Sequence, residues 1–126
     1  MSQIIDTSVL MAVMRNEPGA DAACKLIPGA HVPSVILSET ATKLIDYGET
    51  TLNAWQSVIR LGLSIHPFDT ESARIAASLR PLSRPLGLSF ADRACLTLGI
   101  KLGLPVYTAD RAWAKLKIGL DIRLIR

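Results

Sequence analysis

Aromatic residues are scarce in this chain of 126 residues, where they make up 5% of the sequence. Hydrophobic residues still reach 49%, so the core must consist mainly of leucine, isoleucine, valine and alanine. The length suits one compact domain, which we expect over residues 1–126. No apolar run approaches the roughly 18 residues of a membrane-spanning helix. The start also lacks a basic segment followed by an apolar one, so we expect no signal peptide and a cytoplasmic location.

Cysteine and histidine are equally rare, with two of each. Cys24 and Cys95 have neither C-x-x-C spacing nor a nearby histidine, so we interpret them as buried free thiols in a reducing compartment. His31 and His66 lie in short extended runs that lead to a proline, and we interpret both as structural or surface residues. These residues provide no ligand set for zinc.

Acidic residues are few in the C-terminal part of the chain. From Arg93 to Arg126 there are seven basic and two acidic residues, whereas residues 1–92 hold seven basic and nine acidic ones. The net charge of +3 therefore comes from the C-terminal quarter. This pattern fits a basic face for a polyanion, and it fits the solvated face of a charged helix equally well.

Short apolar runs alternate with amphipathic segments throughout the chain. Strands are expected at residues 2–5, 30–33, 63–67, 105–108 and 122–125. Helices are expected at residues 8–15, 21–26, 34–47, 49–61, 69–79, 89–103 and 110–117, and a proline-rich loop at 81–87. Single helices or helix pairs between strands predict an α/β fold with a mostly parallel, five-stranded sheet.

The first strand and the fourth end alike, with a carboxylate close to a hydroxyl. Asp6 follows the first apolar run and has Ser8 nearby, and Asp110 follows the fourth and has Thr108 nearby. Ligands of open α/β sheets bind beyond the carboxyl ends of the strands. If these two strands are neighbours, Asp6 and Asp110 converge at that edge.

Two further acids are expected at the same edge. Asp92 lies in the first turn of the helix that leads into the fourth strand, and Glu39 lies near the start of another helix. Taken singly, each acid has a structural explanation. Asp92 has capping-box spacing from Ser89, Asp6 and Asp110 precede helices, and Glu39 is an ordinary surface acid.

Four converging carboxylates repel one another unless a cation neutralises them. An oxygen-only ligand set suits Mg²⁺ or Mn²⁺, and such a metal can activate water for phosphodiester hydrolysis. The hydroxyls of Ser8 and Thr108 could orient ligands or water. An aspartyl-phosphate enzyme is a weaker alternative, because the second aspartate expected two residues after Asp6 is Ser8 here.

Four motifs in this order resemble those of PIN domains, and above all those of VapC-type toxins. They are Ile4-Ile5-Asp6-Thr7-Ser8-Val9-Leu10, Ser38-Glu39-Thr40, Ser89-Phe90-Ala91-Asp92-Arg93-Ala94-Cys95 and Thr108-Ala109-Asp110-Arg111-Ala112-Trp113. The resemblance implies a Rossmann-like α/β/α sandwich with strand order 3-2-1-4-5. It also implies an endoribonuclease that depends on Mg²⁺ or Mn²⁺.

The resemblance further assigns roles to residues and names partners. It implies that Asp6, Glu39, Asp92 and Asp110 form the acidic site, with Thr108 and Ser8 as hydroxyl support. It implies a homodimer that cleaves RNA and is silenced by a small cognate antitoxin. The alternative is a PIN-like module that holds RNA or a protein without cutting.

Overall fold

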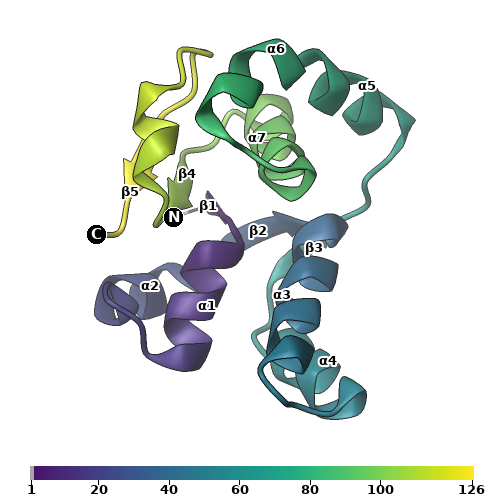
Figure 1. Ribbon diagram of the computed structural model, residues 1–126, viewed down its shortest axis with the longest axis vertical. Helices are drawn as coiled ribbons and strands as arrows, with labels where there is room; N and C mark the ends of the chain where they lie inside the picture. Colours follow the sequence, from purple (N-terminus) through teal and green to yellow (C-terminus); the bar gives the residue numbers. More distant parts are fainter. Residues whose placement is uncertain (1) are drawn as a thin grey trace.

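A five-stranded parallel sheet forms the centre of the protein, as seen in a computed structural model that describes residues 2–126 (Figure 1). The strand order is β3-β2-β1-β4-β5, and all four pairings are parallel. The strands are β1 (Gln3–Ile5), β2 (Ala30–Pro33), β3 (Ser64–His66), β4 (Val106–Thr108) and β5 (Ile122–Leu124). The expected strand order is confirmed.

Helices cover both faces of this sheet. Helices α1 to α4 cover one face and α5 to α7 cover the other, which gives the expected three layers (Figure 1). The α-helices are α1 (Thr7–Arg15), α2 (Ala20–Leu26), α3 (Ser34–Asp46), α4 (Thr51–Ile59), α5 (Thr70–Ser78), α6 (Arg80–Ser83) and α7 (Phe90–Leu102), and the 3₁₀ helices are η1 (Arg84–Leu86) and η2 (Arg111–Lys115). None of the helices over residues 2–126 has the length and apolar character of a membrane span.

Strand β1 lies in the middle of the sheet and is the most deeply buried. Ile4 and Ile5 are fully enclosed, as an apolar strand covered on both faces must be. Aliphatic residues dominate the core as predicted, and Trp113 of η2 is its largest fully buried side chain. The buried centre of the sheet therefore fixes the positions of the residues that directly follow β1 and β4.

Two segments differ from the expectation. Residues 81–87, expected as a loop, are helical in α6 and η1. Pro81 and Pro85 are the second residues of these helices, in the first turn, where a missing N–H group costs no hydrogen bond. Residues 110–117, expected as an α-helix, form only the short 3₁₀ helix η2.

The edge strand β3 pairs with β2, and this pairing brings two histidines together. Nδ1 of His31 and Nε2 of His66 are 2.9 Å apart, which is hydrogen-bond distance. Nothing in their sequence spacing predicted this contact. The imidazole pair lies outside the acidic site and fits the structural role expected for both residues.

Helix α7 approaches β4 very closely at Gly99. A Cβ atom on Gly99 would lie 2.6 Å from Cγ2 of Val106 and 3.3 Å from Cδ1 of Leu120. Carbon atoms in contact normally lie about 3.5–4.0 Å apart, so a methyl group here would push the helix away from the sheet. This close approach matters because α7 carries Asp92 in its first turn.

We predict that Gly99→Ala destabilises the fold, although alanine favours helices by about 1 kcal/mol over glycine. Overpacking in a core typically costs about 1–3 kcal/mol, so the net loss should be on the order of 1 kcal/mol. Urea unfolding measures it. Val106→Ala opens space opposite the added methyl, so Gly99→Ala should be tolerated better in that background. A Gly99→Ala protein more stable than the wild type would contradict close packing at this point.

Candidate functional site

Asp6 lies where β1 ends and α1 begins, and its side chain is buried at 3% exposure. Its Oδ1 accepts a hydrogen bond from the backbone N–H of Val9 at 3.1 Å and so caps α1. The same oxygen accepts from the Ser8 hydroxyl at 2.6 Å, and Oδ2 accepts from the Thr108 hydroxyl at 2.7 Å. The carboxylate thus caps a helix and also joins β1 to β4.

Backbone amides at the end of β4 hold these two hydroxyls in place. The N–H of Ala109 donates to Ser8 Oγ at 2.8 Å, and the N–H of Asp110 donates to Thr108 Oγ1 at 3.0 Å. A hydroxyl has one proton to donate, and each of these is used on Asp6. The arrangement therefore suits an ionised Asp6, which only accepts hydrogen bonds.

The charge on Asp6 is costly where it lies. Burial raises the pKa of this carboxyl group from 3.8 to about 6, although the Ser8, Thr108 and Val9 hydrogen bonds act to lower it. The nearby charge of Asp92 raises the pKa further. Within residues 2–126 no lysine, arginine or histidine forms an ion pair with Asp6. A cation bound here would remove most of this cost.

Asp92 occupies the first turn of α7 and completes a capping box with Ser89. Its Oδ2 accepts from the Ser89 N–H at 2.8 Å, while its own N–H donates to Ser89 Oγ at 3.2 Å. Partial burial raises the pKa of Asp92, and the charges of Glu39 and Asp110 add to the increase. The charge of Asp92 therefore interacts with those of all three other predicted acids. Asp92 therefore caps α7, as its structural explanation predicted, and it does so through Oδ2, so that Oδ1 could bind a ligand.

Glu39 projects from α3 into a pocket next to Asp92. The pocket has a volume of about 430 Å³, and its lining is Val35, Ser38, Glu39, Ser89, Phe90 and Ala91. Glu39 is half-buried rather than on an open surface. Helices α3 and α7 contact each other here, which brings the second and third motifs together.

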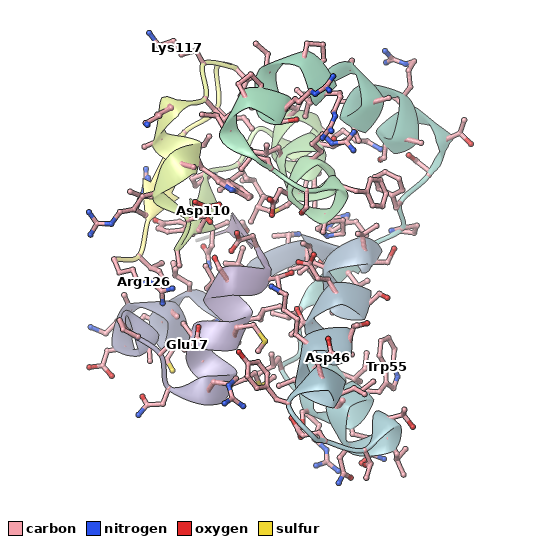
Figure 2. The ribbon with its side chains drawn as sticks, in the orientation of Figure 1. Glu17, Asp46, Trp55, Asp110, Lys117 and Arg126 are labelled. Carbon is pink, nitrogen blue, oxygen red and sulfur yellow. The ribbon has the colours of Figure 1, made fainter. Side chains whose placement is uncertain are left out.

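Asp110 follows β4 and is the most exposed of the four acids. Its Oδ1 accepts from the N–H of Ala112 at 3.0 Å and caps η2, which leaves Oδ2 free. In the view of Figure 2 it lies close to the start of α1, where Asp6 is found. Pairing of β1 with β4 accounts for this convergence, as the sequence predicted.

The four acids lie near one another, but their side chains are not arranged as a complete set of metal ligands. Among residues 2–126, no three carboxylate, imidazole or thiol side chains stand close enough to hold a metal ion as they lie. Their chemistry nevertheless fits a hard divalent cation, because the donors are oxygens and the pKa values of Asp6 and Asp92 are raised by burial and by neighbouring acids. Each aspartate also keeps a lone pair that the hydrogen bonds above do not use.

The two cysteines differ from each other. Cys95 is fully buried, and its Sγ lies 3.6 Å from the carbonyl oxygen of Ile5, directly behind the acidic site. Burial raises the pKa of this thiol, and the neighbouring acids raise it further. Cys95 is thus a neutral core residue, as expected. Cys24 is exposed, so its predicted burial is wrong.

Sequence reasoning missed one feature of the site, an aromatic side chain at its entrance. Phe90 is 50% exposed and lines the pocket beside Glu39. Its position between the cap Ser89 and the acid Asp92 indicated only that it lies near the site. An apolar residue at the start of a helix gave no reason to expect an exposed ring.

Comparison with known proteins agrees with the fold and the motifs. The sequence model of the PIN domain matches residues 4–119. Mycobacterium tuberculosis VapC20, described as a sarcin-ricin loop cleaving toxin, is similar in structure with a TM-score of 0.73, 20% identity and coverage of 92% of this chain and 97% of that one.

Two complexes contain similar chains. One is a toxin–antitoxin complex from Klebsiella pneumoniae, with a TM-score of 0.72, 17% identity and coverage of 96% of this chain and 95% of that one. The other is the DNA-bound VapBC from Salmonella typhimurium, with a TM-score of 0.71, 16% identity and full coverage of both chains. No curated protein sequence matches this chain. The match to the domain model spans most of the chain, which therefore belongs to the PIN domain family.

Proposed function

We propose that this chain is a divalent-metal-dependent endoribonuclease, the toxin of a type II toxin–antitoxin pair in the cytoplasm. One observation supports this most strongly. The buried Asp6 carboxylate accepts hydrogen bonds from two hydroxyls, no lysine, arginine or histidine of residues 2–126 forms an ion pair with it, and it lies near the charge of Asp92. Membership of the PIN family and the likeness to toxin structures support the same function.

In this proposal Asp6, Asp92 and Asp110 hold Mg²⁺ or Mn²⁺, and Glu39 completes the set. The metal supplies an activated water and stabilises negative charge on the phosphate. Ser8 and Thr108 keep the Asp6 carboxylate ionised and correctly turned, because both donate to it. The capping box fixes Asp92 at the start of α7.

Basic residues next to the acids would hold the RNA backbone. Arg111 follows Asp110 directly and is exposed, and like Lys115 of η2 it forms no ion pair with any residue in the range 2–126. By contrast, Arg123 and Arg126 are paired with acids. Of the C-terminal basic residues, Arg111, Lys115 and Lys117 are thus exposed, form no ion pair within residues 2–126, and are free to meet phosphates.

The alternative is a PIN-like module that binds RNA or a protein without cutting. A binding module has no need of a carboxyl group buried so deeply that its pKa rises to about 6. The measurement that separates the two is cleavage of RNA in the presence of metal.

We predict that purified protein cleaves RNA with Mg²⁺ or Mn²⁺ and that excess EDTA abolishes cleavage. Asp6→Asn and Asp92→Asn should each reduce cleavage at least about 100-fold, since each removes a charged metal ligand. Asp69→Asn is the matched control, because Asp69 caps α5 as Asp6 caps α1 but lies outside the site. Equal cleavage in EDTA, or by Asp6→Asn, would refute the mechanism.

We also predict that Asp6→Asn stabilises the metal-free protein at neutral pH. Between pH values of about 4 and 6, folded Asp6 keeps a proton that the unfolded chain has lost, so wild-type stability falls as pH rises through this window. A pKa raised from 3.8 to about 6 corresponds to roughly 3 kcal/mol at neutral pH. Urea unfolding in EDTA at several pH values should show the Asp6→Asn advantage growing across the window.

Asp69 provides a control of opposite sign for this experiment. A hydrogen bond from Ser72 is the main cause that lowers the pKa of Asp69 to about 2, and Lys101 contributes. Its charge therefore stabilises the fold above the unfolded pKa, and this stability is lost as pH falls toward 2. Asp69→Asn should destabilise the protein at neutral pH. If Asp6→Asn did the same, burial would not dominate at Asp6.

The proposal includes a homodimer and a small antitoxin. Exposed apolar residues on and after α3 and on α4 offer surface for such contacts, and Trp55 lies on the outer side of α4 (Figure 2). These residues are Ile45, Tyr47, Leu52, Trp55 and Ile59. The similar chains in toxin–antitoxin complexes support a partner of this kind.

We predict that the chain, tagged and expressed in its own host, copurifies with a small protein that has a basic tail. An arginine or lysine of that tail should reach the acids and compete with metal. Retention of the partner should therefore fall as Mn²⁺ is added during washing. Absence of any small basic partner, or retention that ignores Mn²⁺, would contradict this part of the proposal.

A further inference from the structure

Phe90 is a large apolar residue that lies at the surface of the protein. It is the first residue of α7, it follows the cap Ser89, and it stands two residues before Asp92. Half of its surface is exposed, whereas the next residue, Ala91, is buried. Exposing a large ring costs hydrophobic stabilisation, and here the exposed ring borders the pocket that also contains Glu39.

Neighbouring side chains hold the ring in place. Phe68, from the segment between β3 and α5, meets Phe90 edge-on, with centroids 5.4 Å apart and planes at 88°. The guanidinium carbon of Arg93 lies 5.8 Å from the Phe90 centroid, and Arg93 is anchored by a 3.0 Å hydrogen bond to the carbonyl of Ala76. The exposed surface of Phe90 is therefore presented by a braced ring rather than by a mobile one.

The pocket beside the ring suits a nucleobase. Its volume is about 430 Å³, and it is lined by apolar side chains from Val35, Phe90 and Ala91 together with the polar residues Ser38, Glu39 and Ser89. A nucleobase has flat apolar faces and a polar edge, so a lining of apolar and polar side chains suits it. Glu39 lines the pocket, and Asp92 stands two residues after Phe90 on α7, so a base held here would belong to a nucleotide close to the acidic site.

We propose that Phe90, braced by Phe68, is a substrate-positioning residue that stacks on an unpaired base adjacent to the phosphate that is cut. The inference rests on the proposed ribonuclease function and deepens it. Bases within a duplex are stacked on each other and cannot reach a side chain, whereas bases of loops and single strands can. Aromatic stacking on bases is tolerant of sequence, so Phe90 can stack on any unpaired base.

The test uses the full chain and a short synthetic single-stranded RNA that spans a wild-type cleavage site. Phe90→Leu keeps the apolar bulk and removes the aromatic face, whereas Phe90→Tyr keeps the face. We expect Phe90→Leu to raise KM by about 5- to 150-fold, the range of one lost stack, with much less change in kcat. Phe90→Tyr and Ile100→Ala, an exposed apolar residue of the same helix, should behave like wild type.

An abasic substitution in the RNA identifies the contact. An RNA that lacks the base on one side of the cut should raise the wild-type KM as Phe90→Leu does, and the two changes combined should add little more. If Phe90→Leu and wild type have the same KM, or if the two losses are fully additive at every position next to the cut, the stacking inference is wrong.

Other results also separate the possibilities. A fall in kcat with unchanged KM would mean that Phe90 only positions Asp92, and would overturn the inference. Loss of partner binding with unchanged RNA cleavage would make Phe90 a protein contact and would overturn it too. If the wild type cuts no RNA in Mg²⁺ or Mn²⁺, the proposed function itself fails, which is a different outcome.

Discussion

The hydrogen bonds to the Asp6 carboxylate are the interaction on which the rest of the site depends. They connect the end of β1, the start of α1 and the end of β4 through one buried side chain. Backbone amides of Ala109 and Asp110 orient the two hydroxyls, so the geometry of the sheet itself sets the direction of each proton. The fold thereby maintains a negative charge in a place where burial opposes it.

Helix α7 brings the second essential group to this point. Its close packing on β4 at Gly99 sets the position of its first turn, and the capping box with Ser89 fixes Asp92 there. Burial disfavours the charged forms of Asp6 and Asp92, and the charges of neighbouring acids add to this effect. In the function proposed above, a metal ion or the basic residue of an inhibitor would supply the positive charge that offsets this cost.

Much of this arrangement could be predicted from the sequence, because it depends on local patterns. The apolar runs predicted five strands, and carboxylates at strand ends predicted which residues meet at one edge. Proline near the start of a helix was misread as a loop at residues 81–87, since its tolerance there depends on the following turn. The exposure of Phe90 and its contact with Phe68 depend on packing between segments far apart in the sequence, which no local pattern encodes. The same holds for the contact between His31 and His66.

Calorimetric titration of the metal-free protein with Mn²⁺ at neutral pH would show whether the buried Asp6 carboxylate is a metal ligand. We expect saturable binding by the wild type that weakens as pH falls through about 6, where Asp6 gains a proton. We also expect a large loss of affinity in Asp6→Asn and in Asp92→Asn, and none in Asp69→Asn. Equal Mn²⁺ affinity in the wild type and Asp6→Asn would contradict the account, because the buried carboxylate would then not be a metal ligand.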